Sequence, residues 1–178
     1  MAQSNYDLVI IGAGSGGLIA ADFAVKLGAR VALVEKSRIG GDCTWTGCVP
    51  SKALLKVAKV AHEVRTAYCY GITSSPPVTE MAKVRNYVLA AIQQVYQFES
   101  PEELQKKGVD VLQGSARFVG PRSIEVADRI VRSKKFLITT GARAVLPPIT
   151  GLNEVPFVTY EKIFENDRLP NKLVVIGG

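Results

Sequence analysis

The sequence predicts an α/β fold built on a parallel sheet, with long helices and a small β-meander inserted into it. The apolar run at residues 7–11 leads into a glycine-rich turn, and apolar residues then recur at helical spacing over 18–27. A second apolar run follows at 30–35. Two strands joined through a helix pair in parallel, so these segments predict a strand–helix–strand unit. The apolar run at 135–139 predicts another buried strand of the sheet.

Two long helices are predicted after this unit. Apolar residues at helical spacing extend from 51 to about 70 and again from about 79 to 98, with turn residues between them. Ser100 suits the N-cap and Pro101 the first position of a shorter third helix. The meander is predicted from short apolar stretches that alternate with turn residues, at 109–112, 117–119, 123–126 and 129–131.

The composition is that of a soluble globular protein, with 47% hydrophobic and 21% charged residues among 178. No apolar stretch approaches the ~20 residues of a membrane span, so no membrane association is expected. The first residues lack the pattern of a leader peptide, and a cytoplasmic protein is expected. The net charge of +6 is spread along helical stretches without interleaved aromatic residues, which indicates a solvated surface rather than a nucleic-acid site.

The glycine-rich turn has the spacing of a dinucleotide-binding, Rossmann-like site. Gly12 permits a tight turn, Gly14 lets a pyrophosphate approach the backbone, and Gly17 allows the helix to pack closely on the strand. The phosphates are expected at the start of the helix, where unpaired amides favour anions. Glu35, at the end of the second strand, can accept hydrogen bonds from the ribose. These residues alone do not distinguish FAD from NAD.

Three regions are expected along the chain. Residues 1–150 form the nucleotide-binding domain, and the stretch 151–171, entered through proline and glycine, forms a linker. Residues 172–178 repeat the opening pattern of an apolar strand followed by glycine. They are therefore expected to be the first strand of a second nucleotide-binding domain in a longer polypeptide.

Cys43 and Cys48 lie shortly after the glycine turn and predict redox chemistry. A disulfide needs alpha carbons within about 7 Å, whereas residues five apart in an ideal helix are separated by ~7.5 Å along the axis. The intervening turn must therefore be distorted, for which Gly47 supplies backbone freedom. A regular helix beginning beyond Cys48, with Pro50 in its first turn, would stabilise a thiolate through its exposed amides. A reactive, reversible disulfide is the expected result.

Three other interpretations stay open at this point: a structural disulfide, two buried thiols that never meet, and half of a zinc site. Cys69 is the only further cysteine, so the chain lacks the pattern of a secreted disulfide scaffold. A tetrahedral zinc site would need Cys69, the single histidine His62 or a carboxylate as its other ligands. A flavin can exchange electrons with a thiol pair, which favours FAD over NAD as the dinucleotide.

The segment GGDCTWTGCVPSKALL at 40–55 resembles the redox motif of the FAD-containing pyridine nucleotide-disulfide oxidoreductases, the class that holds dihydrolipoamide dehydrogenase, glutathione reductase and mercuric reductase. The segments at 140–142 and 114–116 resemble that family's flavin-contacting and adenine-side segments. Asp42 and Trp45 stand where threonine and asparagine are usual. The resemblance covers essentially the whole chain, and it implies the N-terminal FAD domain of a class I enzyme, closest to the mercuric reductase branch.

The resemblance implies a role for each reactive residue of this motif. Cys43 would be the interchange thiol that attacks substrate, and Cys48 the thiol against the flavin. Lys52 would lie near the isoalloxazine ring, where a cation stabilises the reduced, anionic form. Cofactor contacts are implied for Gly12, Gly14, Ser15, Gly17, Glu35, Lys36, Gly41, Asp42, Cys43, Lys52, Ala116, Thr140, Gly141 and Ala142. No resident metal is expected.

The reaction implied by the resemblance passes a hydride from NAD(P)H to FAD, then electrons to the Cys43–Cys48 disulfide, and on to a small-molecule disulfide or a metal ion through Cys43. Dihydrolipoamide dehydrogenase or glutathione reductase activity is the alternative, and a nucleotide-binding module without thiol chemistry is another. The full-length protein would be a homodimer. This chain alone would be inactive, because the family's NAD(P)H domain and acid/base pair are expected to lie elsewhere.

Overall fold

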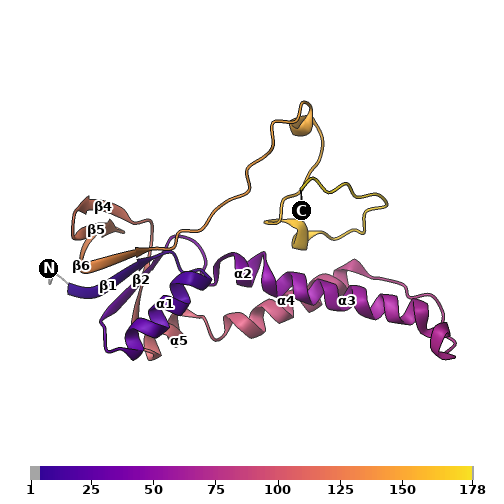
Figure 1. The fold of residues 1–178 in the computed structure, drawn as a ribbon, viewed down its shortest axis with the longest axis horizontal. Helices are drawn as coiled ribbons and strands as arrows, with labels where there is room; N and C mark the ends of the chain where they lie inside the picture. Colours follow the sequence, from indigo (N-terminus) through magenta and orange to yellow (C-terminus); the bar gives the residue numbers. More distant parts are fainter. Residues whose placement is uncertain (1–4, 178) are drawn as a thin grey trace.

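The computed structural model describes residues 5–177, in which a six-stranded sheet is joined to a long helical hairpin (Figure 1). The elements in chain order are β1 (Asn5–Ile11), α1 (Ser15–Lys26), β2 (Val31–Glu35), α2 (Gly41–Trp45), α3 (Cys48–Thr66), η1 (Ala67–Tyr70), α4 (Met81–Tyr96), α5 (Pro101–Lys106), β3 (Val109–Gln113), β4 (Arg117–Gly120), β5 (Ser123–Val126), β6 (Arg129–Ile138), η2 (Leu152–Glu154) and η3 (Ile163–Glu165).

The strands lie in the order β3-β2-β1-β6-β5-β4. Strands β3, β2, β1 and β6 pair in parallel, whereas β6, β5 and β4 pair antiparallel. The predicted α/β fold, with a parallel sheet, inserted long helices and a small β-meander, is therefore confirmed.

The parallel strands are buried on both faces. On one face, Leu33 of β2 packs in a cluster with Ala21 of α1 and Leu104 of α5. On the other face, Val34 packs in a second cluster with Ile124 of β5, so the meander covers this side. Consecutive residues of β2 thus enter two apolar clusters, which explains why its sequence is continuously apolar rather than alternating.

Strand β6 differs from the prediction. The sequence predicts separate strands at 129–131 and 135–139, but one continuous strand of ten residues forms instead. Its first part pairs antiparallel with β5 and the remainder pairs in parallel with β1. The basic residues at 129–135, expected in a helical stretch, lie in this strand instead, where Lys134 is exposed while Ser133 is buried. Strand β3 also leaves the predicted meander, since it pairs in parallel with β2.

The helices position the cysteine segment beside the sheet. Helix α3 begins at Cys48, earlier than predicted, and Pro50 lies in its first turn, where amides have no intrahelical acceptor. The cap predicted at Ser100 is confirmed, because its Oγ accepts a hydrogen bond from the Glu103 amide at 3.3 Å. Helices α3 and α4 pack together through a small cluster that includes Ala53, and this hairpin extends away from the sheet (Figure 1).

The segment from 139 to 177 contains only short helical turns, η2 and η3, of which η3 contacts α4. It runs back beside the helical hairpin (Figure 1). The strand predicted at 172–178 is not formed within 172–177, and Gly178 lies outside the described residues. A strand is stable only where a neighbour satisfies its backbone groups, and Val174 and Val175 are exposed here.

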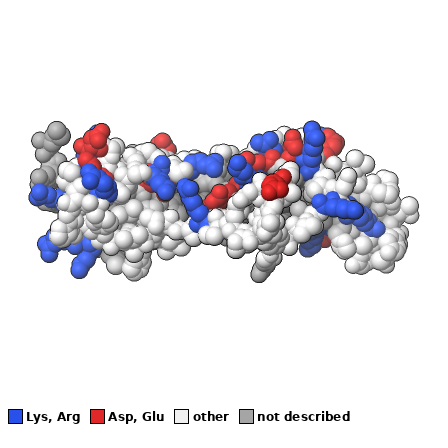
Figure 2. Space-filling model, turned by 90° about the horizontal axis from the view of Figure 1, so that it is seen from above, with Lys and Arg blue, Asp and Glu red and all other residues white. Residues whose placement is uncertain are grey.

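Charged side chains are mixed on the face shown in Figure 2, where lysine and arginine lie among aspartate and glutamate. Some form pairs along a helix, such as Lys26 Nζ with Asp22 Oδ2 at 2.6 Å. Of the helices that the structure describes, none combines the length and apolar character needed to span a bilayer.

Candidate functional site

The glycine turn after β1 is shaped by contacts that exclude larger side chains. Gly12 has a φ of +105°, and a Cβ there would lie 2.3 Å from the carbonyl oxygen of Thr139. Gly17 is buried, and its Cβ would lie 2.0 Å from the Gly12 carbonyl oxygen. Any side chain at either position would push α1 or the end of β6 away from the turn. These glycines therefore set how closely the start of α1 approaches the strand ends.

The start of α1 presents free backbone amides. Gly14 is the N-cap, no side chain in the described part of the chain caps it, and the first intrahelical bond runs from Leu18 N to Gly14 O at 2.9 Å. The amides of residues 15–17 precede that bond, so they are available to an anion. A Cβ at Gly14 would meet only the Gly41 Cα, at 3.8 Å. The turn is thus an open cradle of amides that fits the pyrophosphate of a dinucleotide.

Glu35 holds the turn through its carboxylate. Its Oε2 accepts a hydrogen bond from the Ala13 amide at 2.7 Å, and its Oε1 accepts one from the Ser37 amide at 2.8 Å. Each carboxylate oxygen has a second lone pair, so both remain able to accept from ribose hydroxyls. The neighbouring Lys36 is exposed, and the Glu35 carbonyl accepts from Gly114 N at 2.8 Å. That bond holds the segment leading to Ala116 beside the acid.

The end of β6 forms the other wall of the turn. Thr139 Oγ1 donates to the Gly12 carbonyl oxygen at 2.8 Å, and Thr139 N donates to Ile11 O at 2.8 Å. The sequence pattern pointed to Thr140, Gly141 and Ala142, which are exposed just beyond this wall. Thr139 is the side chain that fastens β6 to the glycine turn, and no motif indicated it.

The two cysteines lie on different helices. Cys43 is in the short helix α2, and Cys48 is the first residue of α3. The chain leaves helical geometry between them at Gly47, where φ is −126° and ψ is −112°. A Cβ at Gly47 would lie 2.8 Å from the Asp42 carbonyl oxygen, so a glycine is needed for this turn to close. The predicted distortion between the cysteines is present, and it separates two helices rather than bending one.

The Cys43 thiol responds to both its partner and the glycine turn. Cys43, Cys48 and Cys69 are free thiols. The neighbouring Cys48 side chain raises the pKa of the Cys43 thiol above its ordinary value, and burial adds to the rise. Ser15 and the Cys48 backbone act in the opposite direction. The neutral thiol is therefore favoured at Cys43 relative to an isolated cysteine.

A carboxylate anchors the helix that carries Cys43. Thr44 is 1% exposed, and its Oγ1 donates to Glu99 Oε2 at 2.7 Å. Gly40, with a φ of +105°, lies against the same two side chains, because a Cβ there would be 2.8 Å from Glu99 Oε2. Thr44 stands between Cys43 and Trp45 in the redox motif, whereas Glu99 lies 55 positions away and outside any motif, so the sequence did not indicate this contact.

Trp45 fixes the other end of α2. Its Nε1 donates to the Ile39 carbonyl oxygen at 2.7 Å, and its ring centroid lies 5.1 Å from that of Tyr96. The Arg38 guanidinium lies 4.4 Å from the indole centroid, within range of a cation–π contact. Trp45, which stands where the related motif has asparagine, therefore packs between the segment that carries Ile39 and the end of α4.

Asp42 and Lys52 face solvent near the cysteines. Asp42 lies in the first turn of α2, where a negative charge complements the helix dipole. Its Oδ2 accepts a hydrogen bond from the Tyr160 hydroxyl at 3.2 Å. Burial, followed by this bond, raises the pKa of Tyr160. The added carboxylate thus meets a hydroxyl from the 139–177 segment rather than a cation.

The zinc interpretation finds no support in the described residues. Within residues 5–177, no three histidine, cysteine, aspartate or glutamate side chains are grouped closely enough to hold a metal ion. His62 and Cys69 are exposed on α3 and η1.

Comparison with known proteins identifies the family. A sequence profile described as "Pyridine nucleotide-disulphide oxidoreductase" matches residues 6–178. This chain belongs to that family. It is 34% identical to a mercuric reductase from Staphylococcus aureus, over 98% of this chain and 32% of that protein. It is 33% identical to a glutathione reductase from Burkholderia cepacia, over 100% of this chain and 39% of that protein.

A dihydrolipoyl dehydrogenase from Acholeplasma laidlawii is also 33% identical, over 99% of this chain and 54% of that protein. The chain thus spans about a third to a half of the length of these pyridine nucleotide-disulphide oxidoreductases. The family resemblance carried by the cysteine motif is confirmed, and the chain is related to oxidoreductases.

Proposed function

We propose that this chain is the FAD-binding part of an NAD(P)H-dependent disulfide oxidoreductase of the mercuric reductase type. One observation carries the proposal: the segment that bears Cys43 lies against the glycine turn, since a Cβ at Gly41 would lie 2.7 Å from the Gly14 Cα. The thiol pair therefore adjoins the amide cradle that suits a dinucleotide. A redox pair and a dinucleotide turn in contact make electron transfer between them geometrically direct.

The residues around the turn fit FAD. The amides of 15–17 would hold the pyrophosphate, and the carboxylate of Glu35 would accept from the ribose. Lys52, on α3 one turn after Cys48, would place a positive charge beside the ring. Bound FAD would supply two-electron redox chemistry at this position. Residues 114–116 and 140–142 would contact the adenine and flavin sides.

The two cysteines have distinct roles in this proposal. Two electrons and two protons convert a Cys43–Cys48 disulfide into two thiols, one of which ionises. Because Cys48 is the first residue of α3, the unpaired amides of that helix start favour negative charge on its sulfur in this proposal. Cys48 is then the thiolate held in place, and Cys43 is the thiol that engages substrate after losing its proton to a base.

Adjacent thiols also bear on the substrate. Soft metal ions prefer thiolate ligands, and a mercuric ion that accepts two electrons leaves the pair as a disulfide. Mercuric reductases from Staphylococcus aureus and Lysinibacillus sphaericus are among the related proteins, at 34% and 31% identity. A small disulfide is the other substrate class that such a pair can reduce, by thiol–disulfide exchange at Cys43.

The remaining parts of the proposal concern the rest of the protein. Residues 1–150 form the flavin domain and 151–171 the linker, and 172–178 begin a second, NAD(P)H-binding domain. The exposed apolar side chains of residues 173–176 support this, because such a run needs a sheet to cover it. The full-length protein acts as a cytoplasmic homodimer, and residues 1–178 alone do not turn over.

Anaerobic reduction of the full-length protein, loaded with FAD, tests this function. We expect a long-wavelength absorbance band from the Cys48 thiolate against the flavin, which disappears in Cys48→Ser and persists in Cys69→Ser. Cys69 is a matched control because it is an exposed thiol on η1. If FAD binds but wild type and Cys48→Ser give the same spectra, the chain is a nucleotide-binding module without thiol chemistry. Absence of any yellow cofactor would contradict the flavin assignment itself.

A further inference from the structure

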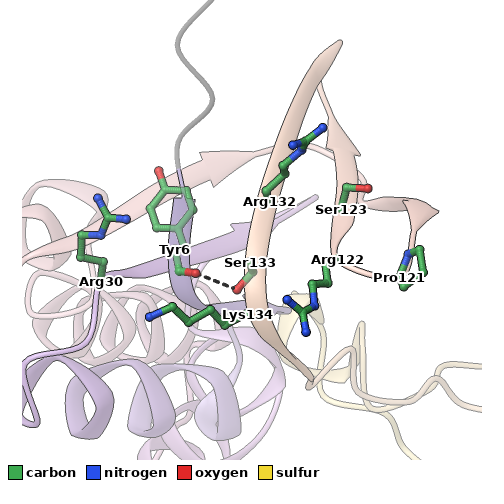
Figure 3. Close-up of a pocket in the computed structure, with 8 residues that line it drawn as sticks. All are labelled: Tyr6, Arg30, Pro121, Arg122, Ser123, Arg132, Ser133 and Lys134. Atoms are coloured by element: carbon green, nitrogen blue, oxygen red, sulfur yellow. Dashed lines mark hydrogen bonds between the residues drawn. The ribbon is translucent and has the colours of Figure 1, made fainter.

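A concave pocket of about 650 Å³ lies on the sheet, lined by residues of β1 and β6 and by the segments before β2 and β5 (Figure 3). Its lining includes four cationic side chains, which are Arg30, Arg122, Arg132 and Lys134. Cavities of ~300–1,000 Å³ are typical of small-molecule sites. The volume alone therefore suits a ligand of metabolite size.

The pocket is separate from the glycine turn. Tyr6 lies near the start of β1 and Arg30 just before β2, so both mark the amino ends of parallel strands. The glycine turn follows the carboxyl end of β1 at Ile11. A strand rises ~3.3 Å per residue, so the six steps from Tyr6 to Gly12 separate the two sites by roughly 20 Å. A dinucleotide in the amide cradle leaves this pocket unfilled.

The charges around the pocket are incompletely compensated. Lys134 Nζ pairs with Asp7 Oδ1 at 2.7 Å, and this bond is the first cause that lowers the pKa of Asp7. In the described part of the chain, neither Arg122 nor Arg132 forms an ion pair, and no carboxylate lines the pocket. Asp110 lies nearby and keeps its charge while it accepts the Tyr6 hydroxyl at 2.9 Å. The cations that line the pocket outnumber these two nearby carboxylates, Asp7 and Asp110, and this excess of positive charge favours an anionic ligand.

The pocket is built on fixed backbone. Ser133 is 5% exposed, its amide donates to the Arg122 carbonyl oxygen at 3.1 Å, and its Oγ donates to the Lys135 carbonyl oxygen at 2.6 Å. Ser123 pairs with Arg132 in the antiparallel register of β5 and β6. The arginines are therefore attached to hydrogen-bonded strands or to the turn between them. Such a base fixes where the arginine side chains begin, and a ligand would have to order the exposed side chains themselves on binding.

We propose that this pocket binds a small soluble molecule bearing at least two phosphate groups. A guanidinium presents a planar fork of donors that matches phosphate oxygens in bidentate fashion, and two arginines suit two such groups. Lys134 adds a point charge that is shared with Asp7. The site would bind a ligand other than the dinucleotide, because it lies at the amino ends of the parallel strands and the glycine turn lies at their carboxyl ends.

Inorganic pyrophosphate is the probe for this site. We expect saturable binding by isothermal titration calorimetry to the full chain with FAD in excess, which occupies the amide cradle. Arg132→Gln and Arg122→Gln should each weaken binding by at least about tenfold, the cost of one charge-assisted phosphate contact. Arg129→Gln is the matched control, since it removes the same charge from the same strand outside the pocket. It should change the dissociation constant by less than about twofold.

Three results would overturn the proposal. Failure to detect pyrophosphate binding in wild type would exclude small molecules with two phosphate groups as ligands of this pocket. Equal weakening by Arg129→Gln and Arg132→Gln would show that net charge, and not the pocket, attracts the anion. Pocket-dependent binding to phosphatidylinositol bisphosphate vesicles, with none to free pyrophosphate, would assign the phosphates to a lipid surface. Far-ultraviolet circular dichroism of each variant separates loss of binding from loss of folding.

Discussion

Replacing Thr44 with valine removes one hydroxyl and keeps the side chain's size and branching. In wild type that hydroxyl is buried and donates to Glu99 Oε2 at 2.7 Å. The variant leaves a half-buried carboxylate oxygen without its donor, and it frees α2 from the end of α4. Because Cys43 immediately precedes Thr44, the redox helix should loosen where it holds the thiol.

The cost follows from the kind of bond that is lost. A hydrogen bond to a charged group contributes about 1.5–3 kcal/mol, and the lower end applies because water can reach part of Glu99. For a domain of this size each kcal/mol shifts the melting temperature by roughly 2–4 °C. Thr44→Val should therefore lower the free energy of unfolding by about 1.5 kcal/mol and the melting temperature by about 3–6 °C.

Thermal unfolding of this chain measures this change, with Thr46→Val as the matched control. Thr46 follows the same helix, but its Oγ1 lies 3.5 Å from Asp42 Oδ1 in an exposed contact. Its loss should cost under about 0.5 kcal/mol. Glu99→Gln keeps an acceptor for Thr44 and should cost less than Thr44→Val, since only the charge is lost.

Equal melting temperatures for Thr44→Val and Thr46→Val would refute the anchoring role of Glu99. So would an unchanged rate of Cys43 alkylation in a Thr44→Val protein that is clearly destabilised, because the helix position would then not depend on the bond.

Two further changes test the thiol and the glycine turn. The thiolate is the form of cysteine that reacts with iodoacetamide. Cys48→Ala removes the largest cause of the raised Cys43 pKa, so it should speed the labelling of Cys43 at about pH 8. Ser15→Ala removes a cause that lowers this pKa, so it should slow the labelling. Mass spectrometry of the labelled peptide gives both rates, and the same change in both variants would contradict the opposing contacts. Gly17→Ala forces a Cβ to 2.0 Å from Gly12 O and should cost about 1–3 kcal/mol and abolish FAD binding. Gly16→Ala, with its nearest neighbour at 3.6 Å, should leave fluorimetric melting and FAD titration unchanged, and equal losses would show that crowding is not the cause.

Local spacing was enough to predict the parts of the fold that depend on local geometry. The turn requires a positive φ at Gly12 and close packing at Gly12 and Gly17, and only glycine allows this. The spacing of the glycines along the sequence therefore indicates the turn. The cap at Ser100 was readable for the same reason. The contacts of Thr44 with Glu99 and of Asp42 with Tyr160 join positions 55 and 118 apart, and nothing in either local sequence names the partner.

Strand β6 shows a second limit of sequence reasoning. Arg132, Ser133 and Lys134 separate the two apolar stretches that the sequence predicts as strands. Here the strand crosses from the meander to the parallel sheet, so its two halves have different neighbours and different exposure. Which residues of β6 are buried depends on the strand that pairs with each half. These neighbours, β1 and β5, are distant in sequence from most of β6 or reach it only in the folded sheet, so local sequence does not show the continuous strand.

The chemistry of Cys43 depends on contacts that its spacing from Cys48 does not encode. The rise in its pKa that Cys48 causes follows from the break at Gly47, but the opposing effect comes from Ser15, which is near because Gly14 and Gly41 lie against each other. A chain with the same two cysteines and a bulkier residue at Gly41 would lose that approach, since a Cβ there would lie 2.7 Å from the Gly14 Cα. Gly41, a glycine of the motif, therefore affects the thiol as well as the second cysteine does, because it decides whether the nucleotide turn can approach Cys43.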